Sequence, residues 1–256
     1  MKIAVLVKQV PGRDGVLRPT ADGSWFDEGE VAFETNEADT YALEEALQLC
    51  ERAGGGEVVA VSLGPERVQK SLRDCLARGA GRAIHLLTEA STATDPYTTA
   101  TRLAALLKTE GCDLILAGVQ SDDLSSGQTP LLVGEFLGMA TATLITATEL
   151  LDGAIRVKQE LEGGWCQWLT LPLPATLGIQ TGINRPRYPT IKGIMGAKRK
   201  AIATVAAAEL ATAPPLQRLD HLFVPRKEKR TVMIEGSADE AASRLVAILK
   251  NDLKVL

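Results

Sequence analysis

The stretch Leu114-Ile-Leu-Ala-Gly-Val-Gln-Ser-Asp-Asp-Leu-Ser-Ser-Gly-Gln-Thr129 combines three different patterns. It opens with a continuous apolar run, which is typical of a strand buried on both faces of a parallel sheet. A polar loop follows, and the sequence then predicts a helix that begins near Gln128. Such a loop presents N–H groups, hydroxyls and the positive end of a helix, which favours a phosphate-binding site. An ordinary loop of Ser and Asp capping residues is the alternative.

The same alternation of apolar runs and amphipathic stretches fills the first half of the chain. The opening run at 3–7 ends in Lys8 and the turn Pro11-Gly12, and Asp39 or Thr40 is the expected N-cap of the next helix. We predict strands at 3–7, 58–63, 83–87 and 114–117, and helices at 41–49, 66–78 and 98–108. Strands and helices that alternate in this way indicate a doubly wound, mostly parallel α/β sheet with right-handed crossovers.

The pattern changes after Gly138, where the turn signals Asp152-Gly153 and Gly163-Gly164 separate apolar runs. We predict an antiparallel excursion with strands at 142–150, 155–161 and 165–171, followed by a strand at 173–180 that returns to the core.

The end of the chain is predicted to be an arm. The stretch after Lys200 is rich in alanine and leads to Pro214-Pro215, which indicates a linker. Ser237 is the expected cap of a helix that runs to about Leu253. We therefore divide the chain into a nucleotide-binding α/β domain at 1–213 and a linker with a helical arm at 214–256, because the arm is too short to be stable alone.

The composition excludes several classes of protein. The chain has 256 residues, of which 45% are hydrophobic and 23% charged, as in globular proteins, and no apolar run is long enough to span a membrane. A formal charge of −4 argues against a dedicated nucleic-acid-binding protein. The four cysteines form no C-x-x-C pair and the N-terminus carries no leader, so we expect a protein of the reducing cytoplasm without direct membrane insertion.

Most signatures of enzymes are absent from the sequence. It contains no G-x-G-x-x-G after the first strand, no P-loop and no G-x-S-x-G elbow. Its two histidines, His85 and His221, belong to no metal or triad spacing. We therefore predict no catalytic residue and no metal site, and expect a protein that holds a reactive group instead of supplying its own acid, base or nucleophile.

Two segments supply candidate ligand contacts. The hydroxyls that can donate to phosphate oxygens belong to Ser125, Ser126 and Thr129. Gly127 permits close approach of the backbone, and Asp122 or Asp123 can accept hydrogen bonds from ribose hydroxyls. The second segment is Asn36-Glu-Ala-Asp39 at the entrance to the first helix, for which plain capping is the alternative.

A cluster of cations lies in a part of the sequence without acidic residues. Residues 163–208 contain no Asp or Glu, and the cations of segment 184–200 are Arg185, Arg187, Lys192, Lys198, Arg199 and Lys200. Nucleic acid is the weaker candidate partner, because base stacking needs more aromatic residues than the 4% present. An acidic protein partner is favoured, with a merely solvated loop as the alternative. The apolar side chains of Ile191, Ile194 and Met195 argue against a solvated loop.

Five motifs follow one another along the chain. They are Val7-Lys8-Gln9-Val10-Pro11, Tyr41-Ala-Leu-Glu-Glu-Ala-Leu47, Val59-Ala-Val-Ser-Leu-Gly-Pro65, the loop from Ala117-Gly118 to Gln128-Thr129, and Asn184-Arg-Pro-Arg-Tyr-Pro-Thr-Ile-Lys-Gly-Ile-Met195. In this order they resemble the beta subunit of electron transfer flavoprotein, from Met1 to about Lys200. The resemblance implies an adenine-nucleotide alpha-hydrolase-like fold and an alpha subunit that holds most contacts to a redox FAD. It also implies an AMP with a structural role in the beta subunit.

The resemblance further implies where the nucleotide and the partners bind. The AMP site would consist of Leu6, Asn36, Glu37, Ala38, Asp39, Leu63, Gly118, Asp122, Asp123, Ser125, Ser126, Gly127, Gln128 and Thr129, with the last two at the phosphate. Segment 184–200 would be the recognition loop for flavin dehydrogenases such as acyl-CoA dehydrogenases. Its partner contacts would be Arg187, Tyr188, Ile191, Ile194, Met195 and Lys198. The electrons would pass on to a quinone reductase.

The sequence departs from the family pattern at three positions. Asn36 is followed by Glu37 instead of Pro, Arg185 replaces a usual Glu, and Arg13 stands where some members place a Tyr near the flavin. A subgroup that binds a second FAD in place of AMP has a loop reading Thr-Ala-Gln-Val, unlike Ser126-Gly-Gln-Thr129. We therefore expect AMP, with a second FAD as one alternative and a stand-alone adenine-nucleotide-binding module without redox function as another.

Overall fold

The fold is taken from a computed structural model that describes residues 1–89, 95–211, 213–225 and 231–255. The chain divides into two compact units, Met1–Leu222 and Phe223–Leu256. The second unit contains helix α6 (Ala238–Ala247) and the π-helical turn η4 (Ile248–Asp252). As predicted, Ser237 caps α6, because its side chain accepts a hydrogen bond from the backbone N–H of Glu240.

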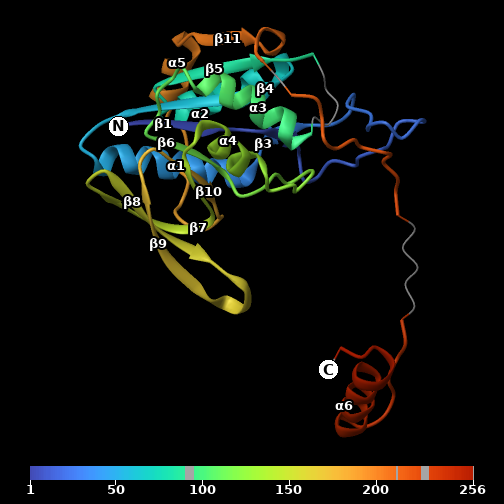
Figure 1. The fold of residues 1–256 in the computed structure, drawn as a ribbon. Coiled ribbons are helices and arrows are strands. Elements are labelled where there is room, and N and C mark those ends of the chain that lie inside the picture. Colours follow the sequence, from blue (N-terminus) through green and yellow to red (C-terminus); the bar gives the residue numbers. More distant parts are fainter. Residues whose placement is uncertain (90–94, 212, 226–230, 256) are drawn as a thin grey trace. The chain divides into compact units, whose positions relative to one another are not determined.

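A nine-stranded sheet forms the centre of the first unit (Figure 1). Its strands are β1 (Lys2–Leu6), β4 (Glu57–Gly64), β5 (Arg82–Leu87), β6 (Leu114–Gly118), β7 (Ala140–Leu151), β8 (Ala154–Glu160), β9 (Cys166–Pro172), β10 (Ala175–Ile179) and β11 (Ile202–Ala206). They lie in the order β11-β5-β4-β1-β6-β10-β7-β8-β9. Neighbours from β11 to β7 pair in parallel, whereas β7, β8 and β9 pair antiparallel. The predicted mostly parallel sheet with an antiparallel excursion is confirmed.

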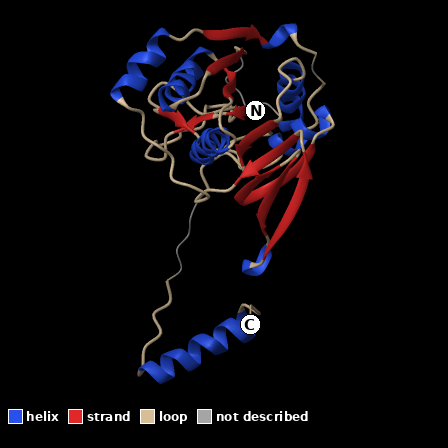
Figure 2. Cartoon of the chain, turned by 90° about the vertical axis from the view of Figure 1, so that its left-hand side faces the viewer, coloured by secondary structure: helices blue, strands red, loops and turns tan. Residues whose placement is uncertain are grey.

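Helices cover both faces of this sheet (Figure 2). One face carries α1 (Glu37–Arg52), α2 (Gln69–Arg78) and α5 (Ile191–Arg199), and the other carries α3 (Pro96–Leu107) and α4 (Thr129–Leu137). Short 3-10 turns are η1 (Glu66–Val68), η2 (Glu162–Gly164) and η3 (Ala207–Glu209). Among the described residues, every helix is too short or too polar to cross a membrane.

The first strand shows why the opening run is apolar throughout. Ile3 and Val5 belong to the core beneath α1 and α2, whereas Ala4 and Leu6 belong to the core beneath α3. Successive side chains of a strand point to opposite faces, so a strand covered on both faces has no exposed position for a polar residue. The opening run is therefore apolar throughout because helices cover both faces of β1.

Three segments differ from the sequence prediction. Helix α1 begins at Glu37 and not after Asp39, because Asp39 is buried in the first turn and accepts hydrogen bonds from the N–H groups of Lys8 and of Gly118 at the end of β6. The alanine-rich stretch after Lys200 is not only a linker, since β11 pairs in parallel with β5 at the sheet edge. Segment 184–200 contains helix α5, whose N-cap Thr190 accepts a hydrogen bond from the N–H of Gly193 at 3.0 Å.

The carboxyl ends of β1 and β6 mark a topological switch point. Between β1 and α1 the chain forms the short antiparallel pair β2 (Gln9–Pro11) and β3 (Phe33–Thr35). It then enters α1 on one face of the sheet, whereas the loop after β6 leads to α4 on the opposite face. A crevice between the two loops is where ligands bind in open α/β sheets.

Candidate functional site

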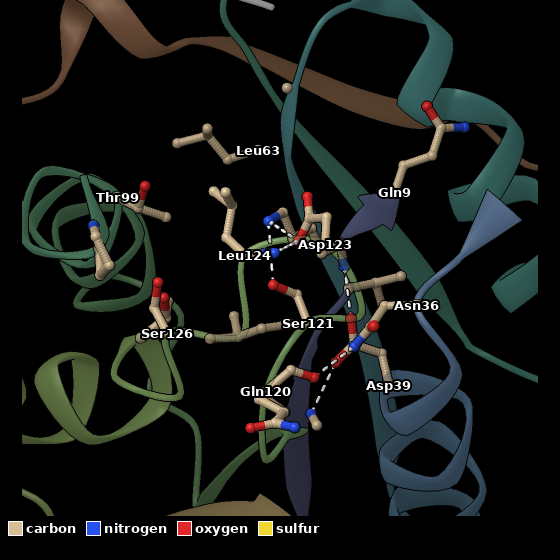
Figure 3. A pocket seen from close by; sticks show the side chains of 18 of the residues that line it. Gln9, Asn36, Asp39, Leu63, Thr99, Gln120, Ser121, Asp123, Leu124 and Ser126 are labelled. Carbon is tan, nitrogen blue, oxygen red and sulfur yellow. Dashed lines mark hydrogen bonds and ion pairs between the residues drawn. The ribbon is translucent and has the colours of Figure 1, made fainter. Parts of the chain in front are cut away.

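A pocket lies at this edge of the sheet, where β1, β4 and β6 end (Figure 3). Leu6, Val61 and Ala117 come from the strands, and the loops that follow them complete the lining. In Figure 3, Asn36 and Asp39 lie on one side of the pocket, and Thr99 and Ser126 lie on the opposite side. The pocket therefore occupies the switch point.

Asn36 joins the start of α1 to the loop that follows β6. It is 1% exposed and lies at the N-cap position, but its side chain makes no capping bond. Instead, its Nδ2 donates to the carbonyl of Gln120 at 3.0 Å, and its Oδ1 accepts from the N–H of Asp122 at 2.9 Å. Its own N–H donates to the carbonyl of Lys8 at 2.9 Å. One buried amide therefore fixes the shape of two pocket walls.

Asp39 lines the pocket and bridges the ends of β1 and β6. It is 5% exposed, and its two carboxylate oxygens accept from the N–H of Lys8 at 2.7 Å and the N–H of Gly118 at 2.8 Å. Burial raises the pKa of Asp39 to about 6, although both hydrogen bonds act in the opposite direction.

We expect Asp39 to make the stability of the fold depend on pH. Its pKa of about 6 lies above the ordinary value of 3.8, so the folded state binds this proton more tightly than the unfolded state. The resulting stabilisation is complete below about pH 4 and is lost as the pH rises through about 6, roughly 3 kcal/mol in all. Urea unfolding of wild type and Asp39→Asn across this range measures it. A difference between the two proteins that stays constant with pH contradicts the assignment.

Lys8 and Asp123 form an ion pair on the pocket wall. The Nζ of Lys8 lies 2.6 Å from Oδ1 of Asp123 and 3.2 Å from the hydroxyl of Ser121. Burial alone would raise the pKa of Asp123, but Lys8 and the N–H of Leu124 bring it below its ordinary value. Because this ammonium is already paired, a phosphate in the pocket would depend mainly on N–H groups and hydroxyls.

The start of α4 faces the pocket. Ser125 and Gly127 have φ angles of 52° and 64°, which turn the backbone before the helix begins. No described side chain caps α4, and the first N–H groups of any helix have no partner within it. Ser126, Gln128 and Thr129 all line the pocket. The arrangement suits a phosphate, which both the N–H groups and the helix dipole favour.

Aromatic residues of the loop after β2 and of the start of β3 form a further wall, which was not predicted from the sequence. Trp25, Phe26 and Phe33 line the pocket, and the ring centroids of Trp25 and Phe26 lie 4.8 Å apart. The guanidinium carbon of Arg67 lies 3.6 Å from the ring centroid of Phe33, and Arg67 also donates to Oε1 of Gln9 at 2.7 Å. The sequence offers one signal for this wall: aromatic residues are only 4% of the chain, and three of them lie close together here.

Most residues predicted for the nucleotide site lie together in the pocket. Those that line it are Leu6, Asn36, Asp39, Leu63, Gly118, Asp123, Ser126, Gly127, Gln128 and Thr129. Those outside the lining are Glu37, Ala38, Asp122 and Ser125.

These last four residues support the walls. Glu37 forms an ion pair with Arg13, and the carboxylate of Asp122 accepts from the N–H of Glu37 at 3.3 Å. Ala38 lies directly against Gly118. The hydroxyl of Ser125 donates to the carbonyl of Ser121 at 3.1 Å, so it is already used within the loop.

The predicted partner-binding segment presents apolar side chains on and before α5. We call Tyr188, Ile191, Ile194 and Met195 the apolar patch; their exposed fractions are 88%, 81%, 43% and 61%. Lys198 is also exposed. Arg187 differs from these residues, because its guanidinium bonds to Glu44 and Glu51 within the chain. Exposed apolar side chains this close together in the sequence are a candidate contact site for another macromolecule.

The fold and the pocket define a doubly wound α/β protein with a ligand cavity at the switch point of its sheet. A family model described as the electron transfer flavoprotein domain matches residues 24–210. The chain belongs to the electron transfer flavoprotein family.

Two relatives are each named electron transfer flavoprotein subunit beta. The protein from Methylophilus methylotrophus is 35% identical over 264 residues, which cover 99% of either chain. The protein from Syntrophomonas wolfei subsp. wolfei is 35% identical over 255 residues, which cover 100% of this chain and 98% of the relative. The resemblance seen in the sequence motifs is confirmed.

Proposed function

We propose that this chain is the beta subunit of a heterodimer in which it holds an AMP and an alpha subunit holds most of an FAD. The observation that carries the nucleotide assignment is the uncapped start of α4, which faces a cavity at the switch point. Membership of the electron transfer flavoprotein family supports the pairing with an alpha subunit and an electron-carrier role.

The residues of the pocket fit a nucleoside monophosphate. The phosphate would be held by the backbone N–H groups at the start of α4 and by the hydroxyls of Ser126 and Thr129. The oxygen of the Asp123 carboxylate that Lys8 does not use would accept from a ribose hydroxyl. Leu6 and Leu63 supply apolar surface for the base. As the family resemblance implies, the nucleotide would stabilise the fold and would not react.

The proposed heterodimer is an electron carrier. Its flavin, when bound, accepts and releases electrons, and this chain walls the site and docks the donor through the apolar patch. The donors would be flavin dehydrogenases such as acyl-CoA dehydrogenases, and the acceptor a quinone reductase. All four cysteines are free thiols, which supports a reducing compartment such as the cytoplasm.

We expect Thr129→Ala to weaken retention of the nucleotide, because it removes a hydroxyl at the phosphate position. The loss of a hydrogen bond to a charged group is worth about 1.5–3 kcal/mol, or a rise in Kd of roughly ten- to a hundredfold. The nucleotide that stays bound through gel filtration, released by denaturation and quantified per chain, measures the effect.

Ser125→Ala is the matched control for this variant. Ser125 belongs to the same loop, but it lies outside the pocket lining and its hydroxyl bonds to Ser121. It should retain the nucleotide as wild type does. If Thr129→Ala retains it equally well, the phosphate is not bound at the start of α4.

A further inference from the structure

A buried glutamate of α1 holds the segment that precedes α5. Glu44 is 4% exposed, and Arg187 approaches it with two parallel hydrogen bonds, from Nε to Oε2 at 2.8 Å and from Nη2 to Oε1 at 2.9 Å. The backbone N–H of Arg187 donates to the same carboxylate at 3.1 Å, and Nη1 reaches Glu51 at 2.8 Å. Burial opposes the charge of Glu44, but the bonds from Arg187 and Gln48 bring its pKa below the ordinary value.

The backbone around Arg187 has further attachments. Asn184 donates to the carbonyl of Tyr41 at 3.1 Å and to Oε2 of Glu45 at 3.0 Å. The carbonyl of Arg187 accepts from Nη1 of Arg78, in α2, at 2.9 Å. The segment that leads into α5 is therefore held by α1 and by α2 together.

Helix α5 also lies directly against α2. A methyl group on Gly193 would overlap the carbonyl oxygen of Ala77, whereas one on Gly196 would have no neighbour within 4 Å. At the other end of the helix, Nη1 of Arg73 donates to the carbonyl of Ala197 at 2.6 Å. The helix is thus fixed at its start, where the glycine is needed for close approach, and at its end.

We propose that Arg187 is a positioning residue, whose ion pair with Glu44 sets the orientation in which α5 presents the apolar patch, and that its guanidinium does not bind the partner. If Arg187 turned outward, Glu44 would be left buried and unpaired, which is strongly unfavourable. Arg185 provides the contrast, because it is exposed and makes no hydrogen bond or ion pair within the described residues. The inference rests on the proposed docking function of the patch.

Kinetics of the heterodimer distinguish positioning from direct contact. The assay follows reduction of its flavin by a flavin dehydrogenase that reduces the wild type, with the KM for that dehydrogenase as the readout. We expect Ile191→Ala and Arg187→Gln each to raise KM about tenfold with kcat within about twofold, and the double variant to show little further loss. Arg185→Gln is the control. In the double variant of Arg185→Gln and Ile191→Ala, the factors by which each substitution changes KM should multiply. Multiplicative effects of Arg187→Gln and Ile191→Ala would mean that Arg187 touches the partner, and would overturn the inference.

Hydrogen exchange tests the same inference without any partner. The amides of α5 should exchange at least about tenfold faster in Arg187→Gln and in Glu44→Gln, but not in Arg185→Gln. Gly193→Ala should accelerate exchange in the same helix, and Gly196→Ala should not. Unchanged exchange in both Arg187→Gln and Glu44→Gln overturns positioning. If Ile191→Ala alone leaves KM unchanged, the proposed docking function of the apolar patch is wrong. The exchange result would still decide whether Arg187 holds α5.

Discussion

Gly118→Ala is expected to destabilise the fold and to empty the pocket. The added methyl carbon would lie 2.6 Å from the Cβ of Ala38, 2.6 Å from Oδ1 of Asp39 and 2.8 Å from the backbone carbon of Ala38. These atoms belong to the buried first turn of α1, so the turn must move away from β6 and the bond between Asp39 and the Gly118 N–H must break. We expect the free energy of unfolding to fall by about 3 kcal/mol or more, the upper end of overpacking costs.

Urea unfolding and the nucleotide content per chain measure the two effects of this substitution. Gly81→Ala is the matched control, because its methyl group would meet only the Cγ of Glu57 and the carbonyl of Val58, both at 3.5 Å. It should unfold within about 0.5 kcal/mol of wild type. If Gly118→Ala keeps the wild-type midpoint and its nucleotide, α1 does not pack on the end of β6 as described.

Asn36→Ala is expected to have the second-largest effect. It leaves the carbonyl of Gln120 and the N–H of Asp122 without their partner. An unsatisfied polar group costs about 1–3 kcal/mol when it is buried; because Gln120 and Asp122 are exposed, water can replace part of the loss, and we expect about 2–3 kcal/mol for the two groups together. The loop after β6 would lose its fixed distance from α1, and the nucleotide should dissociate more readily for that reason. Urea unfolding measures the first effect and nucleotide content the second.

Glu37→Ala separates this effect from a general weakening of the helix start. Glu37 is the next residue, but it lies outside the pocket lining, and its carboxylate forms an ion pair with the exposed Arg13. An exposed ion pair contributes little to stability, so this variant should stay close to wild type. Equal losses in Asn36→Ala and Glu37→Ala would show that the buried amide bonds do not hold the pocket walls.

The central sheet could be predicted from the sequence because its strands are buried on both faces. The clearest parallel strand appears as an uninterrupted apolar run, Leu114–Gly118, which is buried throughout. The start of α1 and the strand β11 could not be predicted in this way. The first depends on bonds from Asp39 to distant backbone groups, and the second has small side chains whose strand character comes from pairing with β5.

The part of the candidate site that one continuous segment supplies could be predicted from the sequence. The loop from Gly118 to Thr129 carries its own signals, since a buried strand, glycine, hydroxyls and a helix start follow one another. The aromatic wall at Trp25 and Phe33 was missed because it reaches the pocket through tertiary packing and has no periodic pattern. The family resemblance implied a partner contact for Arg187, but its bonds to Glu44 could not be predicted from the local segment, because Glu44 is far away in the sequence.

The central claim is that the pocket at the switch point holds AMP while an alpha subunit holds the flavin. The complex purified with its partner, denatured and analysed for released nucleotides by mass spectrometry, tests this most directly. The account predicts one AMP and one FAD for each pair of chains. Release of two FAD molecules without AMP, or of no adenine nucleotide from this chain, would contradict it.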